Sequence, residues 1–160
     1  MSVKAALSKW ASQFNVISKF RLEIGVFTGK SHRKVQVGIT NAELMFIHEN
    51  GSPLRNIPAR PVLQMTLDYA NKNLVEPTVD KCVKIILDNG PDEALVEQEL
   101  NKLAIKLENY ARKIIYSNDG RLAPNTASVA KAKGGNHPLF NTGQLARSIT
   151  CRVVKEDTNA

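Results

Sequence analysis

Residues 92–116 read DEALVEQELNKLAIKLENYARKIIY and hold the longest uninterrupted helical pattern of the chain. Apolar residues recur in this stretch at alternating spacings of four and three, which is the period of one helix face. Acidic residues gather near its start and basic residues near its end, an order that complements the helix dipole. We predict one long helix that packs on a sheet of its own domain; an intermolecular coiled coil is the alternative. The stripe consists of Val96, Leu100, Leu103, Leu107, Tyr110 and Ile114.

Three stretches have the period of a β-strand instead. Apolar residues alternate with polar or small ones in 20–27 and again in 34–40, so these two form an antiparallel hairpin around a basic loop. Residues 148–154 alternate in the same way near the other end of the chain. We therefore predict an α+β fold, in which a small antiparallel sheet of about three to four strands is packed on one face by helices that include the long one.

Shorter helices are indicated by their start and stop residues. Asn41 is a suitable cap for a helix over 42–49, which Gly51 would end. Pro61 can begin the next helix, and Pro77 marks a kink or a fresh start further along.

The second half of the chain predicts two more short helices. One covers 124–131 and is followed by a glycine-containing loop. The other runs through Arg147 and is capped by Thr142.

Length and composition indicate one domain over residues 1–160. The N-terminal residues form an amphipathic helical pattern, so we expect neither a signal peptide nor a membrane span. Cys82 and Cys151 give no disulfide framework and no zinc spacing, and both lie in apolar-periodic segments. We expect two buried thiols, which suits folding in a reducing cytosol.

The net charge of +7 is unevenly distributed. Residues 1–60 carry +6, residues 61–118 carry −2 and residues 119–160 carry +3. Basic surfaces of this kind meet either DNA phosphates or an acidic protein partner, and charge alone does not separate the two. The candidate partner contacts are Lys30, Arg33, Lys34, Lys131 and Lys133.

Motifs that would indicate an enzyme are incomplete. Residues 25–31 resemble a phosphate-binding loop but have the wrong spacing and lead into a strand. His48 and Glu49 lack the second histidine of a zinc protease, and no serine lies in a nucleophile elbow. We expect no catalysis, no cofactor and no metal. Glu49 is instead a candidate ion-pair partner for Arg60.

Two stretches carry a family resemblance. Residues 47–53 with 57–63 read IHENGSP and IPARPVL, and residues 137–149 read HPLFNTGQLARSI. They resemble the two signatures of the small proteins that complete the tail, or join head to tail, in long-tailed bacteriophages. Asn50 and Val62 stand where that family has aromatic residues. The candidate structural signature comprises His48, Glu49, Gly51, Pro58, Arg60, Pro61, Thr142, Gly143, Leu145, Ser148 and Ile149.

The resemblance implies a structural virion protein of the phage neck, made in the host bacterial cytoplasm. Its partners would be further copies of itself in a ring, which the resemblance implies to be a hexamer, and neighbouring tail-tube or head-completion proteins. The resemblance leaves open whether the chain is the tail terminator or an adjacent completion or connector protein. The alternative function is a basic DNA-binding or DNA-packaging accessory protein.

Overall fold

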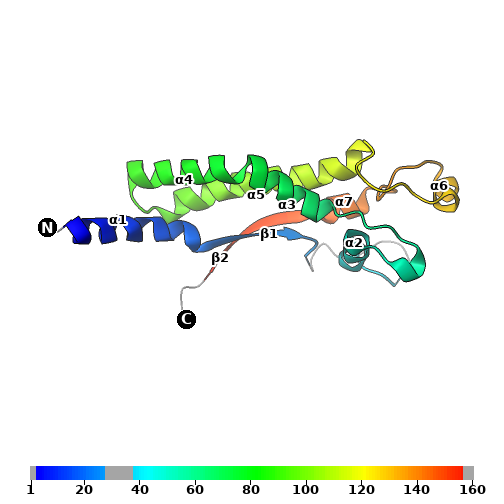
Figure 1. The fold of residues 1–160 in the computed structure, drawn as a ribbon, viewed down its shortest axis with the longest axis horizontal. Helices are drawn as coiled ribbons and strands as arrows, with labels where there is room; N and C mark the ends of the chain where they lie inside the picture. The colour runs from blue at the N-terminus through cyan, green and yellow to red at the C-terminus, as the bar shows by residue number, and fades with distance from the viewer. Residues whose placement is uncertain (1–2, 28–37, 157–160) are drawn as a thin grey trace. The chain divides into compact units, whose positions relative to one another are not determined.

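A computed structural model describes residues 3–27 and 38–156. Internal contacts divide the chain into two compact units, the first assembled from three separate segments of sequence and the second from two. The prediction of a single domain over 1–160 therefore stays a prediction. The elements follow in the order α1 (Val3–Ser18), β1 (Phe20–Gly25), α2 (Asn41–Asn50), the 3-10 turn η2 (Pro53–Arg55), α3 (Val62–Asn73), α4 (Val75–Asn89), α5 (Glu93–Ser117), α6 (Ala127–Lys133), α7 (Gln144–Ser148) and β2 (Thr150–Lys155) (Figure 1).

Unit 1 comprises the described residues of 3–23, 69–106 and 151–156. Helix α1 packs on α4, and the first part of α5 completes the helical layer. Leu22 of β1 and Val153 of β2 pack against the buried residues of these helices. The long helix thus packs on the sheet, as the sequence predicts. The buried core of unit 1 contains Val16, Cys82, Ile86, Val96 and Leu100.

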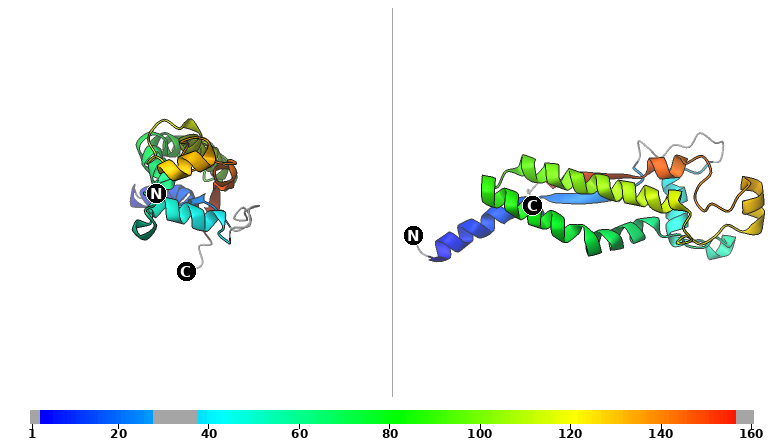
Figure 2. Two further views of the ribbon diagram at one scale, coloured as in Figure 1. Left: turned by 90° about the vertical axis from the view of Figure 1, so that its right-hand side faces the viewer. Right: turned by 90° about the horizontal axis from the view of Figure 1, so that it is seen from above.

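Unit 2 comprises 24–68 and 107–150, of which 28–37 lie outside the described residues. The last part of α5 supplies much of its core, and α2 packs on α7 (Figure 2). Two segments that lie far apart in the sequence therefore meet in this unit. Its buried core contains Met45, Val62, Ala111, Ile114, Ile115, Leu122, Leu139, Leu145, Ala146 and Ile149.

Helix α5 confirms the strongest prediction from the sequence. It covers Glu93–Ser117, and Asp92 caps it by accepting the backbone N–H groups of Ala94 and Leu95 at 2.9 and 3.1 Å. Every residue of the apolar stripe is buried except Tyr110, which is half-buried.

The described residues form a two-stranded antiparallel sheet, β1 with β2, so the expectation of three to four strands is not confirmed. The predicted strand 34–40 lies outside the described residues up to residue 37, and 38–40 are not in a strand. The hairpin loop with Lys30, Arg33 and Lys34 also lies outside them.

Helix boundaries differ from the predictions by a few residues. Thr40, and not Asn41, caps α2, because its hydroxyl accepts the backbone N–H of Glu43 while the Glu43 carboxylate accepts that of Thr40. Pro77 lies in the first turn of α4, where a missing N–H is tolerated. The fresh start at this point is therefore correct. The helix predicted over 124–131 lies instead at Ala127–Lys133.

Cys82 and Cys151 are free and buried, as expected. Burial, followed by the nearby charge of Glu99, raises the pKa of the Cys82 thiol and keeps it protonated. Among the helices within 3–27 and 38–156, none combines the length and the apolar character needed to cross a membrane.

Candidate binding pocket of the two signature segments

The first signature segment, residues 47–63, begins at the end of α2. Gly51 ends this helix with φ 74°, a left-handed conformation that glycine adopts without strain. A Cβ at this position would lie 2.8 Å from the backbone nitrogen of Ala59 and 3.0 Å from the carbonyl oxygen of Ile57. The chain therefore needs glycine here both for its backbone angle and for the close approach of the returning loop.

Glu49 joins α2 to α3. Its carboxylate accepts the backbone N–H groups of Leu63 at 3.0 Å and Gln64 at 2.8 Å, at the start of α3. The predicted Glu49–Arg60 ion pair is therefore wrong: the first-turn N–H groups of α3 have no partner within the helix, and they take the carboxylate instead.

Arg60 is 4% exposed and makes hydrogen bonds to backbone carbonyl groups. Its Nε donates to the carbonyl of Ala123 at 2.7 Å and its Nη2 to that of Pro124 at 2.8 Å, while Nη1 lies 3.3 Å from Nδ1 of His48. The backbone N–H of Arg60 also donates to the carbonyl of His48. Burial lowers the pKa of this guanidinium, which remains charged at neutral pH.

The second signature segment, residues 137–149, contains a strained residue. Leu139 is buried with φ 58°, a conformation that costs a residue with a branched side chain about 1 kcal/mol or more. Strain of this kind persists only where the surrounding packing holds it.

Helix α7 follows within this second segment. Gly143, and not Thr142 as predicted, occupies the N-cap position of α7, with φ 71°. The Thr142 hydroxyl lies one residue earlier and accepts the N–H of Gln144 at a long 3.4 Å. Ser148 donates from its hydroxyl to the carbonyl of Leu145 at 2.6 Å. The segment ends at the fully buried Ile149.

Arg112 of α5 holds the end of the second segment. It donates to the carbonyl groups of Ala146 at 3.3 Å and Ile149 at 3.0 Å, and it pairs with Glu108 one turn earlier. From the sequence, Arg112 was recognised only as one of the basic residues near the end of the long helix. Its bonds to these carbonyl groups were not predictable, because the acceptors lie more than 30 residues away in the chain.

Both signature segments line one pocket of about 380 Å³ in unit 2. His48, Arg55, Asn56, Ile57, Pro58 and Arg60 contribute from the first segment; Leu139, Asn141, Thr142, Gly143, Gln144 and Leu145 contribute from the second. The remaining lining residues are Leu44, Asn125, Thr126, Val129 and Lys133. The two signature segments are distant in the sequence, and the structure brings them together around one pocket.

Of the two predicted partner contacts on α6, one lines the pocket and the other does not. Lys133 lines the pocket, and its amino group lies 3.3 Å from the carbonyl oxygen of Phe140. Lys131 is exposed on the same helix, α6, but does not line the pocket.

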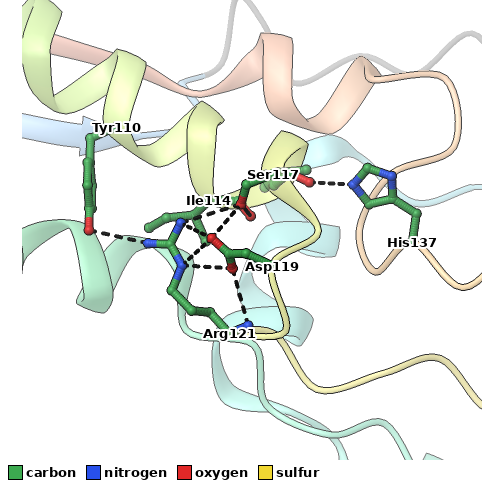
Figure 3. Close-up of polar contacts among 7 residues, drawn as sticks. Tyr110, Ile114, Ser117, Asp119, Arg121 and His137 are labelled. Atoms are coloured by element: carbon green, nitrogen blue, oxygen red, sulfur yellow. Dashed lines mark hydrogen bonds and ion pairs between the residues drawn. The ribbon is translucent and has the colours of Figure 1, made fainter.

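A second polar cluster forms at the end of α5 (Figure 3). Arg121 donates to both carboxylate oxygens of Asp119 at 2.6–2.9 Å and to the Tyr110 hydroxyl at 3.3 Å. The Ser117 hydroxyl donates to Asp119 at 2.9 Å, and these bonds hold the pKa of Asp119 well below its usual range. The sequence did not single out this cluster, although the Ser-x-Asp-x-Arg spacing is visible there.

This polar cluster stabilises the turn that follows α5. His137 donates from Nε2 to the carbonyl of Ile115 at 2.7 Å and stacks on Phe140, so it offers no base to Ser117 (Figure 3). Asn118 and Gly120 have positive φ, which turns the chain after α5. The arrangement fixes a turn.

Within the described ranges, no group of three or more His, Cys, Asp or Glu side chains could hold a metal ion. Among the pockets of the described residues, the one lined by Arg60 and Lys133 is the candidate binding site, because both signature segments line it. Comparison of the chain with family models, with curated proteins and with solved structures gives no match.

Proposed function

We propose that this chain is a structural virion protein of the phage neck, a ring-forming component without catalytic activity that completes the tail, joins it to the head, or does both. The supporting observation is that the two segments that resemble the tail-completion family, nearly 80 residues apart, line one pocket whose buried cation is Arg60. The residues that carry the resemblance therefore lie around one pocket, although they are distant in the sequence.

The roles of the signature side chains favour assembly over turnover. Glu49 caps a helix, Arg60 bonds to carbonyl groups, and Gly51 allows a close backbone approach. Side chains in such roles make a rigid surface, and a rigid surface loses little entropy when it binds a partner. Copies arranged in a ring would each present it, so a modest contact would gain strength from repetition.

The test is to produce phage particles in the absence of this chain. Without it, we expect filled heads and separate tails to accumulate in electron micrographs of lysates, and the parent chain supplied in trans should restore joined particles. Joined, infectious particles at parental yield without the chain would rule the proposal out.

The DNA-binding alternative rests on exposed basic residues, of which Lys131 is an example. Binding to DNA phosphates weakens steeply with added salt, whereas joining of preformed heads and tails through a partly apolar protein contact weakens less. A salt series on the purified chain with duplex DNA separates these functions. Tight DNA binding at low salt, together with normal head–tail joining in the absence of the chain, would favour the alternative.

A further inference from the structure

The pocket lined by the two signature segments carries positive charge without a matching negative charge. Arg60 is buried, and its side-chain partners are carbonyl oxygens and an imidazole. None of the carboxylates in 3–27 and 38–156 pairs with it. A buried cation is costly unless an anion lies close to it. The guanidinium has five N–H donors, and three interactions leave two of them for a ligand.

Lys133 adds a second cation at the same pocket. Partial burial, and then the nearby charge of Arg60, lower the pKa of its amino group. Arg55 lines the pocket too, and among the lining residues that the structure describes there is no Asp or Glu. The pocket is therefore electropositive.

Asn125 supplies an unused hydrogen-bond donor. Its side-chain nitrogen is buried and has no partner in the described part of the chain, although Asn125 lines the pocket. A buried donor of this kind is usually paired. An acceptor that enters the pocket would satisfy it.

The walls of the pocket indicate which anion fits. Leu44, Ile57, Val129, Leu139 and Leu145 all line it, so its apolar surface adjoins its cations. At about 380 Å³ the pocket is much larger than one inorganic anion, and it lies in the size range of sites for small organic ligands. A carboxylate on an aliphatic stem with apolar neighbours matches both features.

We propose that this pocket binds an acidic peptide segment of a partner protein, with a Glu or Asp carboxylate between Arg60, Lys133 and Asn125 and flanking apolar side chains against the leucine and valine walls. The inference rests on the proposed function for the identity of the partner, a neighbouring neck or tail protein. The binding chemistry itself stands on the pocket.

The experiment uses the purified full chain and a defined probe, the peptide N-acetyl-Leu-Glu-Leu amide. We expect saturable shifts of the NMR signals of the Arg60 Nε–H and of the Asn125 side-chain amide. The matched peptide with Gln in place of Glu should bind about tenfold more weakly, because it lacks a charge-assisted hydrogen bond. Inorganic phosphate is titrated in parallel.

Lys133→Gln is the informative variant, since Lys133 is exposed enough to be replaced without loss of the fold. It should weaken binding of the Glu peptide about tenfold, whereas Lys113→Gln, an equal charge change at an exposed lysine outside the pocket, should leave the affinity unchanged. Equal affinity for the Glu and Gln peptides would overturn the inference, as would binding of phosphate without binding of the peptide.

The peptide-binding experiment and the head–tail joining experiment can fail independently of each other. Absence of peptide binding would overturn the pocket assignment even if loss of the chain still separated heads from tails. Peptide binding at Arg60, with head–tail joining unaffected by loss of the chain, would keep the pocket assignment and remove the neck function.

Discussion

The guanidinium of Arg60 holds together segments of unit 2 that are distant in sequence. It bonds to the end of α2 through His48 and to the chain after α5 through the carbonyl groups of Ala123 and Pro124. Those two carbonyl groups lie at different positions along the backbone, and the planar fork of an arginine reaches both at once.

Replacing Arg60 by lysine should therefore destabilise the protein by about 2–3 kcal/mol, because a single amino group cannot satisfy both carbonyl groups. Urea unfolding measures the change. Arg55→Lys is the matched control at an exposed arginine of the same loop, and it should change stability by less than about 0.5 kcal/mol. Equal stability of Arg60→Lys and the parent would contradict the structural role of Arg60.

Gly51 gives a second prediction at this scale. Gly51→Ala should cost roughly 2–4 kcal/mol, since it combines left-handed backbone strain with a Cβ pressed against backbone atoms of the 57–59 loop. Gly120→Ala has a similar φ of 85° but open space around the added Cβ, so it should cost only about 1 kcal/mol. Thermal unfolding of the two variants side by side tests the difference; similar losses would mean that the close approach at Gly51 is unimportant.

Sequence reasoning found Arg60 and Gly51 because each belongs to a recognisable local pattern. It gave Glu49 the wrong partner, since the choice between a neighbouring cation and the N-terminus of α3 depends on how the loop folds back. Asn125 was missed entirely: nothing in its local sequence shows that its amide is buried at a pocket.

At the scale of elements, Glu93 links three parts of unit 1. Its carboxylate lies 2.6 Å from Nζ of Lys19, after α1, and 2.5 Å from Nζ of Lys155 in β2. The hydrogen bond from Lys155, followed by that from Lys19, lowers the pKa of Glu93 from 4.5 to about 2. The start of α5 is thereby held beside the sheet by charge.

This depressed pKa sets the direction of a pH effect. The folded state holds the proton of Glu93 less tightly than the unfolded state, so the stabilisation is fully present above pH 4.5 and is lost as the pH falls towards about 2. Glu93→Gln should therefore reduce stability at pH 7 and flatten its fall across that acid window. Urea midpoints measured across the window test this, with Glu97→Gln as the control at an exposed glutamate of the same helix. A parental slope in Glu93→Gln would refute the assignment.

The long helix was predictable because its stripe runs unbroken through several turns, so each apolar residue supports the same period. The predicted strand at 34–40 was less secure: alternation over a few residues also occurs in loops, and its last three residues are not in a strand. The boundary of α2 shifted by one residue because Thr40 and Asn41 are both good caps, and only the capping box with Glu43 decides between them.

At the scale of the whole molecule, the division into two units was not predictable from composition. Unit 1 is built from three separated segments and unit 2 from two, and α5 contributes to both, so no linker marks a boundary in the sequence. The pocket of unit 2 likewise forms only because segments that are distant in the sequence come together in the fold. The sequence indicated only that the two signature segments are related. The fold was needed to show that cations, and no Asp or Glu, line the pocket between them.

The central claim is that the chain is a ring-forming part of a phage neck. The most direct measurement is the position of the chain in intact particles, by electron cryomicroscopy of virions that carry a small, dense tag on this subunit. The account predicts tag density as a closed ring between the head and the tail tube. Virions without the tag, or tag density confined to the packaged DNA, would contradict it.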